Sequence, residues 1–293
     1  MVYIMGVEEI RQNIKELCLQ INEFDEKNKP IITIPGGATG SAAGLPFEDW
    51  FRGILSKNTK DGVLGKLEFV KYIMENYLCK TNLESLLKDT WWGKLQQFTH
   101  ETIRRVEERE EPKLQQALGD IIVKYGDDLN DVVLINVKAT EINDNGPIGR
   151  PPNIVSAFRL LEFLTELFDE KINLIDKVNV WLAGFYYIPI GSGKVRIEQS
   201  HYRDMFKLDL EKAPPINFDA AIQIQWHLGD MVEREKQTLD EFAKELGEKY
   251  LNEWKSFKKR RDEKMEKIVN KLFSAIERNH AQKKLSDSFT KSS

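Results

Sequence analysis

The spacing of apolar residues changes along the chain, and each change predicts a different element. Residues 7–24 carry isoleucine and leucine at intervals of three and four, which predicts an amphipathic helix. A small-residue loop then ends at Pro46, which we expect to be the first residue of the next helix. Helical patterns continue over residues 65–118, with an interruption near residues 90–93.

From Asp120 onward the pattern becomes that of strands. β-Branched runs at residues 121–123 and 132–137 flank a turn-rich connection, which predicts a hairpin. Gly, Pro and Asn then fill residues 141–153, which predicts a loop. We expect Asn153 to cap a helix that begins directly after this loop.

The last third of the chain contains both the helical and the strand pattern of apolar residues. Two strands are expected at residues 178–190 and 194–199, followed by a helix at about 219–235. Residues 238–282 read as a mostly helical region, and residues 283–293 as a disordered tail.

No internal repeat or low-complexity linker divides the chain. We therefore expect one mixed α/β domain over residues 1–282, with its core at about 31–235 and helical extensions around it.

Composition narrows the class of protein. The 293 residues include 43 Lys and Arg against 47 Asp and Glu, a net charge of −4, and 41% are hydrophobic. A folded chain with a sizeable core is expected, and binding to polyanions by bulk positive charge alone is not. Cys18 and Cys79 lack metal-binding or disulfide spacing, and no segment resembles a signal peptide or a membrane span. A cytoplasmic protein without a membrane partner is the expectation.

Charge is unevenly distributed behind this average. Residues 255–284 contain eleven basic and four acidic residues, a net charge of +7, so the rest of the chain carries −11. A solvated helix face is the usual explanation of such a run, and an arm that flanks DNA is the other. The sequence leaves both open.

A glycine-rich loop at residues 36–44 is a weak candidate for phosphate binding. It lacks the Gly-Lys-Ser/Thr of a P-loop and does not match GxGxxG. Close approach of its backbone to a phosphate, with a helix N-terminus behind it, and a plain surface connection are about equally favoured. No GxSxG motif or histidine cluster indicates a serine hydrolase or a His-rich metal site.

The predicted hairpin is a stronger candidate for a functional site than the glycine-rich loop. Strand alternation puts Asn136 and Lys138 on one face, and Asp120 starts the preceding strand. This is the outline of the D…(D/E)xK nuclease site, in which carboxylates hold Mg²⁺ and a lysine positions the nucleophile and offsets charge on the phosphate. Taken alone, the pattern is short, and Lys138 extending into solvent at a strand end is the simpler interpretation.

Several further sequence blocks, which occur in the same order as in a known family, add to this outline. The sequence resembles the HincII family of type II restriction endonucleases, of the PD-(D/E)xK superfamily, over roughly residues 31–235. The matching blocks are PGGATGSAAGLPFEDW, GDIIVKY with VVLINVKAT, RPPNIVSAFRLL, and PPINFDAAIQIQWHLGDM. The resemblance implies a restriction-endonuclease-like α/β fold: a mixed central sheet flanked by helices, here with a long C-terminal helical extension.

The resemblance implies catalytic roles for particular residues. Asp120 matches the metal-binding aspartate and Lys138 the catalytic lysine, whereas Asn136 occupies the position of the second aspartate. Val137 is implied as a further metal ligand, and Glu48 as a supporting residue. An amide oxygen can ligate Mg²⁺ but adds no charge, so we expect weaker metal binding and slow or absent cleavage. The sequence does not distinguish a natural variant from an inactivated copy. Three acidic residues of the longer connection are conceivable but badly placed substitutes: Asp127, Asp128 and Asp131.

The same resemblance implies residues that contact DNA. Arg150 matches the residue near the centre of the site, where the family has Gln, and Asn153 and Asn217 match asparagines that read base edges. Without the resemblance, Asn153 is equally well explained as a helix cap. The further DNA contacts implied are Ser41, Lys94 and Thr140.

The function implied is a homodimeric endonuclease that cuts both strands of a short palindromic duplex, GTYRAC or a related GTNNAC site, leaving blunt ends. Mg²⁺ is the expected cofactor; Mn²⁺ is expected to substitute and Ca²⁺ to bind without supporting cleavage. A cognate DNA methyltransferase is expected in the same system but not as a physical partner. A sequence-specific DNA-binding protein without nuclease activity and a structure-selective repair nuclease are the alternatives.

Overall fold

The chain divides into two compact units, Met1–Gly247 and Glu248–Ser293. The computed structural model describes most of both units, over residues 6–35, 41–59, 62–110, 117–219 and 222–290.

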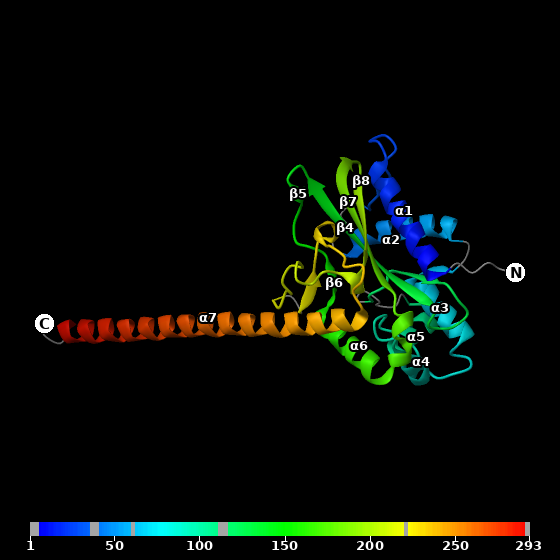
Figure 1. Cartoon of the computed structure of the whole chain (residues 1–293). Helices are drawn as coiled ribbons and strands as arrows, with labels where there is room; N and C mark the ends of the chain where they lie inside the picture. Colours follow the sequence, from blue (N-terminus) through cyan, green and yellow to red (C-terminus); the bar gives the residue numbers. More distant parts are fainter. Residues whose placement is uncertain (1–5, 36–40, 60–61, 111–116, 220–221, 291–293) are drawn as a thin grey trace. The chain divides into compact units, whose positions relative to one another are not determined.

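A seven-stranded sheet forms the centre of the described part of the first unit (Figure 1). In spatial order its strands are β1 (Ile31–Thr33), β8 (Lys194–Asp204), β7 (Val180–Gly191), β4 (Val132–Asn143), β3 (Ile121–Lys124) and β2 (Val63–Gly65), with β5 (Gly146–Pro147) paired to β4. β4 and β7 run parallel and the other pairs antiparallel, so the sheet is mixed. The register of β3 and β4 pairs Ile121 with Ile135, which brings residue 120 close to residues 136 and 137.

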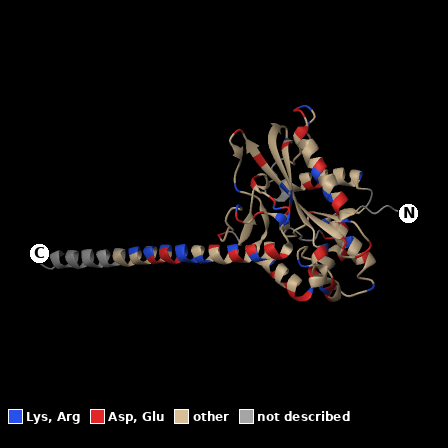
Figure 2. Cartoon of the chain, viewed as in Figure 1, with Lys and Arg blue, Asp and Glu red and all other residues tan. Residues whose placement is uncertain are grey.

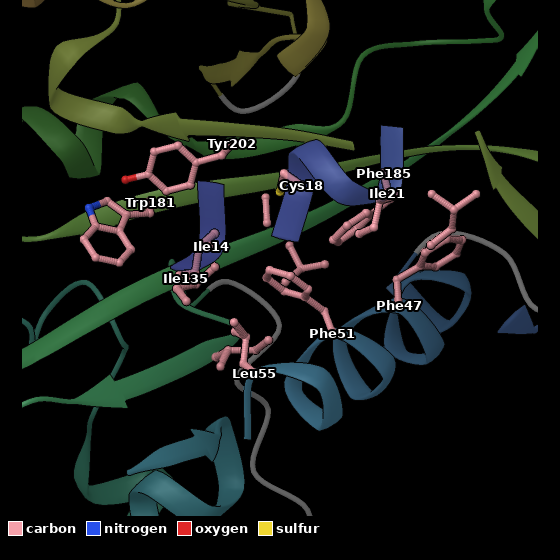
Figure 3. Packing of buried hydrophobic residues seen from close by; sticks show 14 of the residues in the cluster. Ile14, Cys18, Ile21, Phe47, Phe51, Leu55, Ile135, Trp181, Phe185 and Tyr202 are labelled. Atoms are coloured by element: carbon pink, nitrogen blue, oxygen red, sulfur yellow. The ribbon is translucent and has the colours of Figure 1, made fainter. Parts of the chain in front are cut away.

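Two helices cover one face of this sheet. α1 (Val7–Glu23) and α2 (Ser41–Asn58) pack on alternate residues of the central strands, because successive strand side chains point to opposite faces. Figure 3 shows Ile14 and Phe51 of the two helices against Ile135, Trp181 and Phe185 of the sheet. Burial of each such side chain is worth about 1.5–3 kcal/mol. This apolar layer holds β3 and β4 in fixed positions.

Three short helices follow β2: α3 (Lys66–Asn76), α4 (Leu83–Asp89) and α5 (His100–Glu107). Trp91 and Trp92 lie between α4 and α5 and are almost completely buried. The backbone N–H of Trp91 donates to the Asn130 Oδ1 at 3.0 Å, and its indole N–H donates to the Asn130 carbonyl at 3.0 Å. These contacts tie the helices to the β3–β4 connection, and both tryptophans belong to the core.

A second, two-stranded sheet consists of β6 (Asn153–Ser156) and β9 (Gln223–Gln225). α6 (Ala157–Glu170) begins directly after β6. The short 3-10 helices are η1 (Ile172–Lys177), η2 (Met205–Lys207) and η3 (Leu228–Asp230).

The last helix, α7 (Leu239–Thr290), begins in the first unit and makes up the described part of the second. Phe242 and Leu246 anchor its first turns in a buried environment. From residue 251 to residue 274 most side chains are exposed, and many of them are charged (Figure 2). Within the described residues no helix has the length and apolar character needed to cross a bilayer.

The main sequence predictions are confirmed. The helix at 7–24, the two strands of the hairpin and the strands expected at 178–190 and 194–199 all occur. The fold is of the α/β class that the resemblance implied. It has a mixed central sheet, flanking helices and a long C-terminal helix. α7 continues past residue 282, where we expected it to end.

Two helix boundaries differ from the predictions. α2 begins at Ser41, so Pro46 lies inside the helix and not at its first position. The small residues before Pro46 allow an additional turn, at the loss of the single backbone hydrogen bond that proline cannot donate. α6 is capped by Ser156, whose Oγ accepts from the Arg159 N–H at 3.4 Å, and not by Asn153.

Two predictions of element type were wrong. The expected loop at 141–153 is shortened, because β4 continues to Asn143 and pairs with β5. The helix expected at 219–235 is replaced by β9 and η3. Buried Ile224 and Trp226 alternate there with Gln223 and Gln225, a period of two that suits a strand.

Candidate active site

The β3–β4 pair brings Asp120 and Lys138 together. The Asp120 N–H donates to the Ile135 carbonyl at 2.8 Å, and the Asp120 Oδ2 accepts from the Val137 N–H at 2.7 Å. The Lys138 Nζ lies 3.6 Å from the same Oδ2. The buried carboxylate is thus held by backbone on the strand that carries the lysine, and this fixes its orientation.

Asn136 lies between these groups in the sequence and is 1% exposed. Its Nδ2 donates to the Leu118 carbonyl. Its Oδ1 is buried and has no hydrogen-bond partner among the residues that the structure describes. A buried carbonyl oxygen without a partner is costly, so this atom is suited to accept a ligand.

Glu48 and Lys66 complete the cluster. The Lys66 Nζ contacts the Asp120 Oδ1 and lies 3.6 Å from the Glu48 Oε2. Lys66 is the first residue of α3, directly after β2, and β2 pairs with β3 in a register that puts Gly65 beside Ile121. Lys66 was not among the residues predicted from the sequence. Its only local signal is a lysine after a short apolar run, and its place beside Asp120 follows from strand pairing across more than fifty residues.

The electrostatics of the cluster are those of partly buried, paired charges. Burial, and then the negative charge of Asp120, raises the pKa of Glu48 to about 7, although Lys66 and Lys138 act in the opposite direction. Burial lowers the pKa of Lys66, but the carboxylates of Asp120 and Glu48 outweigh it, so that this pKa is raised overall. Near neutral pH, Glu48 therefore exchanges a proton easily, whereas Lys66 stays charged.

The donor atoms fit a divalent cation in kind. Asp120, Glu48 and the Asn136 Oδ1 are oxygen ligands of the type preferred by hard cations, and the last of these has no other partner. Over the described ranges no three His, Cys, Asp or Glu side chains gather as a metal site. The candidate ligands in this cluster are two carboxylates and one amide, and Lys66 contacts both carboxylates.

The acidic residues of the β3–β4 connection are not substitutes for the missing carboxylate. The Lys177 Nζ lies 3.0 Å from the Asp128 Oδ2 and 3.0 Å from the Asp131 Oδ1. The connection joins the ends of the strands where Lys124 pairs with Val132, away from the end that carries Asp120.

A second group of predicted residues gathers on the β6–β9 sheet. Asn153 is exposed at the start of β6, and Asn217 forms an isolated bridge with Gln223 of β9. Gln225, which was not predicted from the sequence, hydrogen-bonds the side chains of both asparagines. Arg150 is exposed in the segment before β6.

Ser41, Lys94 and Thr140 are the remaining residues predicted to contact DNA. Among the described residues, no contact joins them to either group. Ser41 starts α2, but its side chain lies outside the description, as does most of the glycine-rich loop. Lys94 pairs with Glu166 of α6. Thr140 lies two residues beyond Lys138 in β4 and is buried.

The fold and the strand pair bearing Asp120 and Lys138 are those of a restriction-endonuclease-like protein. The family described as restriction endonuclease HincII matches residues 26–276, and the chain belongs to this family. It is a family of type II restriction endonucleases, which act on DNA and generally use divalent metal ions. No curated protein matches the chain significantly.

Proposed function

We propose that the chain is a homodimeric type II restriction endonuclease that hydrolyses both strands of a short palindromic DNA site. The observation that carries the proposal is the buried Asp120 carboxylate, oriented by the Val137 N–H beside the Lys138 ammonium. A palindrome requires the same residues at each half-site, which a twofold dimer supplies. By family resemblance the target is GTYRAC or a related GTNNAC site, cut to blunt ends.

Mg²⁺ is the proposed cofactor, with Asp120, Asn136 and Val137 as the residues that hold it and Glu48 in support. Mn²⁺ is proposed to substitute, and Ca²⁺ to bind without cleavage. The chemistry supplied by a bound divalent ion is polarisation of the scissile phosphate and activation of a water.

The protein's own groups have separate tasks. The Lys138 Nζ lies beside Asp120, where it can orient the attacking water and neutralise charge that develops on the phosphate. Glu48, with its pKa near 7, can accept a proton next to the same carboxylate. The apolar layer of α1 and α2 covers the face of β4 opposite to Asn136 and Lys138 and excludes solvent from it.

Base reading is assigned to Asn153 and Asn217, with Arg150 at the central step. Ser41, Lys94 and Thr140 are assigned to the DNA backbone. For Lys94 this requires exchange of its present partner, Glu166, for a phosphate.

We further propose that Asn136 limits cleavage. Its amide is neutral, so it contributes less to metal affinity than the carboxylate that the family pattern has at this position. In plasmid cleavage with Mg²⁺, Asn136→Asp should raise the rate about a hundredfold.

The matched control is Asn143→Asp, an identical change at an exposed position of the same strand. It should leave the rate unchanged. Equal rates for the original chain and Asn136→Asp would show that this position does not limit activity. Sequencing of the ends produced from a long DNA by Asn136→Asp would report the site and the cut geometry.

A sequence-specific DNA-binding protein without nuclease activity is the second candidate. It is favoured by the contact of Lys66 with both carboxylates, together with the neutral Asn136. Retention of a GTYRAC duplex in Ca²⁺, with no nicking in Mg²⁺ or Mn²⁺ even by Asn136→Asp, would establish it.

The cellular setting is proposed from the function. A restriction enzyme works in the cytoplasm, in a system with a DNA methyltransferase that protects the same site, and without a membrane partner.

A further inference from the structure

Three separate segments meet on the small β6–β9 sheet. Asn153 pairs in register with Gln225, and a bulge follows Asn153. Asn217 joins the same sheet through two backbone hydrogen bonds with Gln223, at 2.9 and 3.0 Å. Ile224 is buried beneath the sheet, so Gln225 lies on the opposite, half-exposed side.

The side chains of Asn153, Gln225 and Asn217, here named the amide triad, form one directed chain of hydrogen bonds. The Asn217 Nδ2 donates to the Gln225 Oε1 at 2.6 Å, and the Gln225 Nε2 donates to the Asn153 Oδ1. The Asn217 Oδ1 accepts from the Asp219 N–H at 3.0 Å. Both asparagine carbonyls are therefore engaged within the protein.

This direction determines what the exposed end of the triad can offer. An amide has two N–H donors and one carbonyl. Gln225 turns the Asn153 carbonyl toward itself, so the Asn153 Nδ2 faces away from Gln225 with both of its hydrogens. Among the residues that the structure describes, none accepts a hydrogen bond from this Nδ2. Asn153 is thus a hydrogen-bond donor at an exposed position.

The backbone near the triad is also unusual. Ile222, which directly precedes β9, has a φ of 55°, a left-handed conformation that is rare for a β-branched residue. Its carbonyl accepts from the Ala157 N–H at 2.8 Å, at the start of α6. Strain of this kind persists where the surrounding structure enforces it, which is typical of functional sites.

We propose that Gln225 is a specificity-determining positioning residue, which holds the Asn153 amide with its donors outward and so selects acceptor-bearing base edges in the major groove. Such edges are the N7 and O6 of guanine and the O4 of thymine. Adenine, which needs a donor and an acceptor from one asparagine, is disfavoured. The inference rests on the proposed function, because it requires Asn153 to face DNA bases.

The test uses selection from a random duplex pool by the full chain in Ca²⁺, followed by Kd measurement on the selected duplex and on a scrambled one. The original chain should enrich one base pair at one position of each half-site, a G·C pair where Asn153 reads guanine and a T·A pair where it reads thymine. Gln225→Ala should lower the ratio of specific to nonspecific affinity about tenfold, with the nonspecific Kd unchanged.

Gln225→Glu is the sharper variant. A glutamate has the same shape but only accepts hydrogen bonds, so the Asn153 amide must turn and present its carbonyl outward. Adenine or cytosine, which carry exocyclic donors, should then be enriched at the same position. A purely structural role of Gln225 would weaken binding without changing the preferred base. Gln12→Ala, at an exposed glutamine of α1 that bonds Glu16, is the control for loss of an amide side chain.

The two ideas fail in different ways. Enrichment of no sequence by the original chain would overturn the proposed function and this inference with it. Enrichment of one site, selected equally well and with the same base preference by both Gln225 variants, would overturn the inference alone.

Discussion

The cluster around Asp120 and the amide triad lie in the same unit of the chain but differ in charge and in burial. At the cluster, Asp120, Lys66 and Lys138 are charged, mostly buried and paired with one another. At the triad, Asn153 and Gln225 are neutral, with Asn153 exposed and Gln225 half-buried. In the cluster, burial strengthens the interactions between charges. In the triad, the directions of the hydrogen bonds fix how each amide is oriented.

The difference has a physical basis. Coulomb interactions strengthen as the effective dielectric falls, so a group that must act on a phosphate gains from burial. Neutral hydrogen bonds are modest in net energy but depend strongly on geometry, and salt screens them little. A nuclease that separates chemistry from reading should respond to mutation and to solution conditions differently in the two regions.

The largest expected effect is at Lys138. In the Asn136→Asp background, Lys138→Ala should lower cleavage about 10²- to 10³-fold, because it removes the charge beside the phosphate. DNA affinity for the selected site should change little, which separates the two regions. Lys194→Ala, an exposed lysine of β8, is the control. Cleavage that survives Lys138→Ala would contradict the role of the lysine.

A smaller effect is expected at Lys66. Without its ammonium, Asp120 and Glu48 lose a counter-ion, so Lys66→Met should bind Mn²⁺ about tenfold more tightly in titration calorimetry without DNA. Lys71→Met, at an exposed position of the same helix, should not. Unchanged or weaker Mn²⁺ binding would show that Lys66 does not compete with metal.

Glu48 predicts a dependence of stability on pH. Its pKa is raised in the folded chain to about 7 from an ordinary value of 4.5, so the folded state binds the extra proton between these values. The stability that this group contributes is full below pH 4.5 and is lost as the pH rises through about 7.

Glu48→Gln should remove that loss. In urea unfolding with a chelator present, the stability of Glu48→Gln relative to the original chain should rise between pH 4.5 and 8 by on the order of 1 kcal/mol. Glu23→Gln, at the exposed end of α1, should show no such trend. A flat difference for Glu48→Gln would argue against a protonated Glu48.

The smallest effect is expected at Arg150, the one charged residue assigned to reading. Because Arg150 is placed at the central step, Arg150→Gln should weaken the preference for the central bases about threefold and leave the salt slope unchanged. Arg104→Gln, at an exposed position of α5, should alter neither. Weaker binding at every sequence, with a salt slope reduced by about 1, would instead place Arg150 at a phosphate.

Much of the fold followed from local patterns. The strands containing Asp120's neighbour Ile121 and Lys138 were predictable, because β-branched runs and strand alternation are properties of short segments. The wrong helix at 219–235 shows the limit of such patterns. A three-residue strand such as β9 depends on its partner β6, which lies some seventy residues earlier.

The sequence by itself determined the restriction-endonuclease class, the Asp120–Lys138 pair and the departure at Asn136. Only the tertiary structure decided that Lys66 contacts Asp120 and that Gln225 joins Asn153 to Asn217. The reason is that Asp120 lies 54 residues after Lys66, and Gln225 lies 72 residues after Asn153, so that strand pairings which no local period encodes bring them together. The net charge of −4 is likewise a sum over the chain, whereas the chemistry depends on which charges the fold buries side by side.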